Sequence, residues 1–140
     1  ENMEINVLGL VAALTAFLTI WFGHVAVRRI EFAAPAIWLP AVIFTTLGLL
    51  TEYWSLVTEN LVLKTALGIA GITFLFDAFE LVRQQRRIRK GHAPANPRNP
   101  RHAAILAEPN SHATTLDLLK REPIGEPVNP DQAAQLVTEH

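Results

Sequence analysis

The sequence contains 140 residues, of which 50% are hydrophobic and 18% are charged, with a formal net charge of −1. This length is enough for one domain at most. Because there is no cysteine, disulfides, thiolate catalysis and cysteine-ligated zinc or iron–sulfur sites are excluded.

The hydrophobic and the basic residues are separated along the chain. Residues 5–82 hold nearly all the aliphatic and aromatic side chains, whereas nine of the twelve lysines and arginines lie from Arg83 onward. The sequence therefore predicts a short flank over residues 1–4, a membrane domain over residues 5–90 and a polar tail over residues 91–140.

The first hydrophobic run, residues 5–27, is long enough to cross about 30 Å of hydrocarbon as a helix. No cation precedes it, and it is longer than the core of a signal peptide, so we expect a retained span and not a cleaved leader. Two further runs of similar length follow, over residues 36–57 and 61–82. Pro35 suits the first turn of the second helix, and Pro40 is expected to kink it.

A soluble three-helix bundle is the alternative, but it would need a polar face on each helix. The interiors of the first two runs offer only threonines as polar residues. The predicted fold class is therefore an all-α membrane protein with three transmembrane helices. Small residues form a stripe on the first and third helices, which allows close packing within one chain or in a homo-oligomer. The stripes are Gly9, Ala12, Ala13 and Ala16, and Ala66, Ala70 and Gly71.

Cations flank the predicted spans asymmetrically. Arg28 and Arg29 follow the first span, and Arg83, Arg86, Arg87, Arg89 and Lys90 follow the third. Three crossings put both sets on one side, which the positive-inside rule assigns to the cytoplasm. We therefore expect a multi-pass protein of the bacterial inner membrane, N-outside and C-cytoplasmic. Its headgroup-facing cations, which would bind anionic lipids, are Arg86, Arg87, Arg89 and Lys90.

Six ionisable residues are expected to gather at the cytoplasmic end of the first and third helices, which run in the same direction. They are His24, Arg28, Glu31, Asp77, Glu80 and Arg83. We favour an ion cluster that fixes the helix register. The alternative is a site that handles protons or grips a ligand, because histidine exchanges protons near neutral pH and Asp77 lies roughly 9 Å inside Arg83.

No catalytic, metal or cofactor residues are predicted. Bis-histidine haem ligation would need two histidines in the spans, and only His24 lies in one. The sequence has no Gly-rich phosphate loop, no His-x-x-x-His pair and no serine nucleophile elbow. We therefore expect no enzyme activity, no cofactor and no nucleic-acid partner.

The tail is rich in proline. The stretches "HAPANPRNPRH" and "EPIGEPVNP" predict an extended chain close to polyproline II. Between them, a short helix is predicted over residues 112–122 with Ser111 as its cap, and another is predicted to follow Pro130. The apolar residues are too few for a core, so we expect the tail to lie along the surface of a partner.

Two stretches resemble a known family. "ELVRQQRRIRKGHAPANP" matches the family's order of Glu-Leu, Gln, basic residues, Lys-Gly, Pro and Asn-Pro. "GHVAVRRIEF", with a later Trp, matches the His, basic residue and Glu that the family has after the first span. The family is DUF4491, small bacterial membrane proteins of unknown function, and the resemblance covers about residues 5–98. It implies the three-span fold and no activity. Val25 stands where the family usually has proline. The matching residues are His24, Arg29, Glu31, Trp38, Glu80, Leu81, Gln84, Arg87, Lys90, Gly91, Pro94, Asn96 and Pro97.

The leading functional hypothesis is a non-catalytic accessory or structural subunit of a larger bacterial membrane complex, for example one of respiratory or photosynthetic electron transfer. Its spans would pack on helices of other membrane-protein subunits, and its tail would strap a cytoplasmic surface. The alternative is a homo-oligomeric ion or proton pathway that uses Asp77, Glu80 and His24. An enzyme that acts on lipid or quinone has no nucleophile or metal set in its favour.

Overall fold

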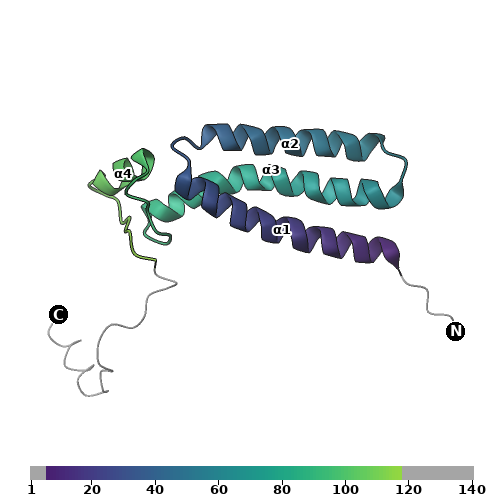
Figure 1. Ribbon diagram of the computed structural model, residues 1–140, viewed down its shortest axis with the longest axis horizontal. Helices are drawn as coiled ribbons and strands as arrows, with labels where there is room; N and C mark the ends of the chain where they lie inside the picture. The colour runs from purple at the N-terminus through teal and green to yellow at the C-terminus, as the bar shows by residue number, and fades with distance from the viewer. Residues whose placement is uncertain (1–5, 118–140) are drawn as a thin grey trace, which may run out of the picture.

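The computed structural model describes residues 6–117, and this part of the chain is helical with connecting loops (Figure 1). The helices are α1 (Val7–Ala33), α2 (Trp38–Val57), α3 (Leu61–Arg89) and α4 (Pro100–Ala107). The first three are long and apolar enough to cross a membrane. The prediction of an all-helical fold with three candidate spans is confirmed, and these helices indicate a multi-pass membrane protein.

Two of the long helices extend beyond the apolar runs from which they were predicted. α1 continues past residue 27 to Ala33, and α3 continues past residue 82 to Arg89. Arginine, glutamine and glutamate are good helix formers, so a helix need not end where the hydrocarbon ends. Gly91 follows the C-cap residue Lys90 and has φ +75°, a left-handed conformation that glycine adopts without steric cost.

The predicted position of Pro35 was wrong. Pro35 lies in the connection before α2, and Pro40 is the third residue of that helix. The first four N–H groups of a helix have no partner within it, so proline in the first turn removes no bond. Pro40 therefore lies in the first turn of α2, where it costs the helix no hydrogen bond.

The three long helices lie side by side in one layer, with α3 between α1 and α2 (Figure 1). On one side, the hydroxyls of Thr19 and Thr73 hydrogen bond at 3.3 Å and join α1 to α3. On the other side, α2 approaches α3 so closely that a Cβ on Gly48 would lie 2.7 Å from Leu75 Cγ. Gly71, from one of the predicted small-residue stripes, is buried beneath Glu52 of α2.

The buried core is small and divides into two clusters. Val27, Phe44 and Leu81 join the three long helices, and a second cluster joins the end of α3 to α4. The second cluster consists of Ile88, Ala93, Ala95 and Ile105. Large apolar side chains remain exposed on α1 and α2, as expected for helices whose surroundings are hydrocarbon.

The segment after α3 folds back onto the helices, and we call residues 91–117 the cap. Backbone hydrogen bonds contribute to this fold: Ala95 N to Thr114 O at 2.8 Å joins two stretches of the cap, and His112 N to Arg89 O at 2.9 Å joins the cap to α3. The prediction of an extended chain was wrong at α4. Asn99 caps that helix and Pro100 takes its first position, the arrangement that starts helices.

The two helices predicted in the tail have different outcomes. Residues 112–117 are not helical. The predicted cap residue, Ser111, instead accepts a hydrogen bond from Ala113 N through its hydroxyl, within an irregular loop. Residues 118–140, with the rest of the first predicted helix and all of the second, lie outside the described residues.

Candidate functional site: a buried carboxylate that joins the cap to the membrane helices

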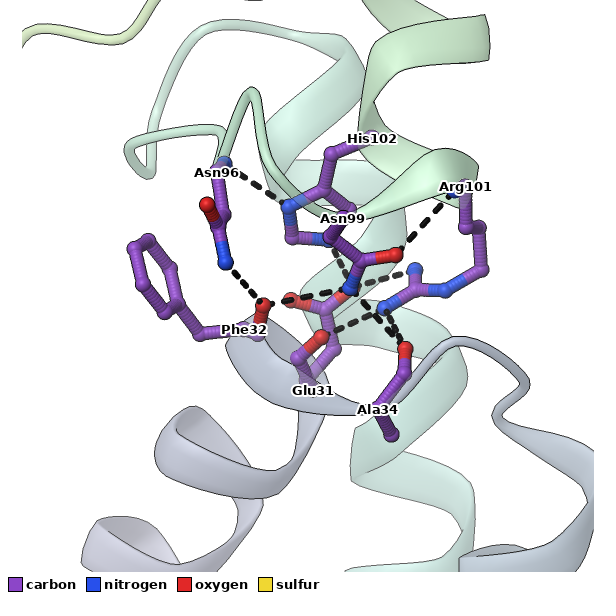
Figure 2. Close-up of polar contacts among 7 residues, drawn as sticks. All are labelled: Glu31, Phe32, Ala34, Asn96, Asn99, Arg101 and His102. Carbon is purple, nitrogen blue, oxygen red and sulfur yellow. Dashed lines mark hydrogen bonds and ion pairs between the residues drawn. The ribbon is translucent and has the colours of Figure 1, made fainter.

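Glu31 lies in the last turn of α1 and is fully buried, with 0% of its surface exposed. It follows Val27 by four residues and so continues the face of α1 that packs on α3. Two cap residues reach its Oε1 atom, as Figure 2 shows: Arg101 Nη1 at 2.6 Å and His102 Nε2 at 3.0 Å. A carboxylate from the first helix is thus neutralised by a cation seventy residues later in the chain.

Asparagine side chains of the cap bind the carbonyl groups at the end of α1. Asn99 Nδ2 donates to the carbonyls of Phe32 at 3.1 Å and Ala34 at 2.9 Å, and Asn96 Nδ2 donates to that of Phe32 at 3.1 Å (Figure 2). The last carbonyls of a helix have no partner within the helix. The cap therefore supplies the hydrogen bonds that the end of α1 lacks.

The hydrogen bonds of His102 define its protonation. The backbone N–H of Asn96 donates to His102 Nδ1 at 2.9 Å, so Nδ1 has a free lone pair and carries no proton. The proton of the neutral ring is then on Nε2, which donates it to Glu31 Oε1. The charge of Glu31 is consequently balanced by Arg101, whose Nη2 also donates to the Glu31 backbone carbonyl, while His102 contributes a neutral hydrogen bond.

The other acids of the predicted cluster lie in separate places along α3. Glu80 is buried and forms ion pairs with Arg83 at 3.2 Å and Arg87 at 2.8 Å. Asp77 is buried one turn earlier and faces Gly23, where a Cβ would lie 2.5 Å from both carboxylate oxygens. The glycine is therefore the residue that lets α1 approach this carboxylate.

The structure thus divides the six predicted residues into several groups. Glu31 binds the cap, Glu80 and Arg83 pair on α3, and Asp77 packs against α1. His24 and Arg28 are exposed, although His24 remains within electrostatic reach of Asp77.

Two of the four cations assigned to lipid headgroups have partners within the protein. Arg87 pairs with Glu80 and also donates to Gln84 Oε1 at 3.1 Å. Arg89 forms a two-bond ion pair with Glu108 of the cap, at 2.9 and 3.1 Å. Arg86 and Lys90 are exposed.

Sequence reasoning missed the four cap residues that complete the site: Asn96, Asn99, Arg101 and His102. The stretch "NPRNPRH" suggested an extended chain because of its prolines. Its asparagines were nevertheless a signal, since an asparagine directly before a proline is typical of the N-cap and first position of a helix. An acid predicted at the end of a membrane helix also required a cation, and Arg101 was one of nine from Arg83 onward.

Comparison with known proteins covers part of the chain. A family model described as a domain of unknown function, DUF4491, matches residues 6–99. The matched range includes Glu31, Asn96 and Asn99 but ends just before Arg101 and His102. No curated protein and no solved structure matches the chain.

Proposed function

The chain belongs to the DUF4491 family, whose function is unknown, and from that premise we propose that it is a non-catalytic accessory subunit of a larger bacterial membrane complex. A complex of respiratory or photosynthetic electron transfer is the example we favour. The observation that carries the proposal is the use of the buried acid. Glu31 is bound by Arg101 and His102 and fastens the cap to the membrane helices, which is a structural task.

The shape of the helix layer supports a role beside other subunits. α3 packs on both neighbours, whereas α1 and α2 pack mainly on α3 and leave large side chains exposed, such as Phe17 of α1 and Leu56 of α2. A single layer of helices has two broad faces. Such a layer fits between the helices of larger subunits or between those helices and lipid, where van der Waals packing drives association.

The position of the cations supports an inner-membrane protein with a cytoplasmic cap. Arg28 and Arg29, the basic end of α3 and the cap all lie at the same end of the helix layer. Cytoplasmic loops carry the excess of lysine and arginine in membrane proteins. In this orientation the cap rests on the cytoplasmic surface, and we propose that the residues after Asp117 contact cytoplasmic subunits there.

The proposal is tested by affinity purification from native membranes in mild detergent, followed by a native gel and mass spectrometry. The full chain is compared with a chain truncated after Asp117. A cut nearer to α3 would remove Arg101 and leave Glu31 buried without its cation, so it would confuse loss of the partner with loss of the cap. We expect the full chain to migrate with one large complex and the truncated chain to be retained less. Recovery of self-oligomers alone, unchanged by truncation, would rule the proposal out.

A second candidate, the homo-oligomeric proton or ion pathway, is favoured by a polar seam between α1 and α3. It contains the bonded hydroxyls of Thr19 and Thr73 and, one turn further along both helices, Asp77 against Gly23. Asp77 Oδ2 is buried and has no hydrogen-bond partner among the described residues. Buried acids in membrane helices are often functional.

Two apolar residues interrupt this seam. Val27 and Leu81, with 1% and 0% of their surfaces exposed, lie between Asp77 and Glu31, so the seam does not continue as a row of polar groups from one acid to the other. The accessory role is therefore the better supported of the two. Proton flux into liposomes containing the purified chain distinguishes them, because a pathway requires Asp77→Asn to reduce the flux. Equal flux from the parent and the variant would exclude the pathway.

A further inference from the structure

A cleft of about 780 Å³ lies where the C-terminal end of α1 meets the cap. Its α1 wall consists of Val25, Arg28, Arg29, Glu31 and Phe32. The end of α3 and two stretches of the cap, residues 94–97 and 115–117, contribute the other walls. This volume lies within the range of small-ligand sites. Nothing in the proposed accessory role requires the cleft.

The charges in the cleft favour an anion. Arg28 and Arg29 are exposed, and both line the cleft. Two carboxylates also line the cleft, but Glu31 is neutralised by Arg101. The other is Asp117, in the wall formed by residues 115–117, so two arginines and one further carboxylate line the cleft.

The apolar walls continue into the membrane-spanning part of α1. Val25 and Phe32 lie on the same helix face as the two arginines, and Leu18 and Trp21 extend that face along the span with more than half of their surfaces exposed. A ligand that suits this arrangement has an anionic head at the membrane surface and a hydrocarbon tail that runs along α1.

We propose that this cleft is a binding site for an acidic phospholipid, whose phosphate lies between Arg28 and Arg29 and whose acyl chain lies along Trp21. Each arginine contributes attraction to an anionic headgroup, and the apolar face contributes burial of the first methylenes. The cations that end α3 attract acidic lipid to this side of the molecule without lining the cleft. The proposal holds whether or not the chain joins a larger complex.

The test places the full chain in nanodiscs of phosphatidylcholine with increasing amounts of phosphatidylglycerol, and native mass spectrometry counts the retained phosphatidylglycerol. The cleft variant is Arg28→Gln/Arg29→Gln. Its matched control, Arg86→Gln/Arg98→Gln, removes two exposed arginines from the same end of the molecule but outside the cleft. We expect the cleft variant to bind about 10-fold or more weakly and the control to bind nearly as the parent does.

A second variant keeps every charge in place. Thr115→Trp fills the cleft from the cap side, so we expect it to weaken retention as well, even if the arginine variant folds poorly. Inorganic phosphate is added as a competitor, and we expect it to leave the lipid bound. The site would be refuted by equal losses in the cleft and control variants, by full retention in Thr115→Trp, or by displacement of the lipid by inorganic phosphate.

Discussion

The ion pair between Glu31 and Arg101 predicts a large and local effect of the substitution Arg101→Met. The arginine side chain is 12% exposed and the glutamate side chain 1%, so the methionine would leave a buried carboxylate with only the neutral hydrogen bond of His102. Removing one partner of a buried pair costs about 3–5 kcal/mol. A loss of about 3 kcal/mol raises the open population of the cap roughly 100-fold, since each factor of ten corresponds to about 1.4 kcal/mol.

Hydrogen–deuterium exchange measures this opening. The amide of Asn96, bonded to His102 Nδ1, and the amides of α4 should lose protection by about that factor, whereas the middle of α1 and α3 should not change. Arg98→Met is the matched control, because Arg98 is an exposed cation of the same cap. Adding Glu31→Gln to Arg101→Met should restore part of the protection by removing the unpaired charge. Unchanged protection in Arg101→Met, or an equal loss in Arg98→Met, would refute this account of the site.

Three other substitutions have defined outcomes. Gly23→Ala places a methyl group 2.5 Å from both oxygens of Asp77, which should separate α1 from α3 and destabilise the protein by about 1–3 kcal/mol, measured as a lower Tm in detergent. Gly91→Ala combines a φ of +75° with a clash against the carbonyl of His112, and should loosen the cap by about 1–2 kcal/mol or more, measured by hydrogen exchange in the cap. Asn99→Ala removes the N-cap side chain of α4 and two hydrogen bonds to carbonyls at the end of α1. It should destabilise the folded segment of residues 91–117 by about 2 kcal/mol and so increase protease cleavage between α3 and α4.

Gly68 provides the matched control for Gly23→Ala. A Cβ on Gly68 would meet only Ser55 Oγ, at 3.2 Å, which a small rotation of the serine relieves, so Gly68→Ala should lower Tm less than Gly23→Ala. Equal Tm values for the two variants would contradict the close approach of α1 to Asp77. If Gly91→Ala exchanges amide hydrogens as slowly as the parent protein, the turn at Gly91 does not hold the cap. If Asn99→Ala is cleaved by protease no faster than the parent, Asn99 does not hold it either.

The sequence was sufficient to predict the number and order of the spans, because a run of about twenty apolar residues has few other stable structures. The ends of the helices were harder to predict. α1 and α3 continue through arginines, glutamines and Glu31, residues that favour a helix as much as the apolar ones do. Hydropathy locates the hydrocarbon boundary, whereas the helix ends are determined by Gly91 and by the loop before α2.

The candidate site could be predicted only in part. Its acid was recognisable, since a glutamate at the end of a span needs a partner. The partners were not recognised, because Arg101 and His102 lie seventy and seventy-one residues away, and no local pattern encodes a contact over that distance. Asp77 and Glu80 were grouped with Glu31 because all three were expected at the same end of α1 and α3. In the structure, residues of the cap bind Glu31 instead.

The separation between Glu31 and its partners also determines the order in which the protein can assemble. During synthesis the first helix, with its carboxylate, is made well before Arg101 and His102 leave the ribosome. Until then Arg101 and His102 cannot neutralise or bind Glu31, so the buried site at the end of α1 is incomplete. The cap can therefore dock on α1 only after α2, α3 and residues 91–102 have been made.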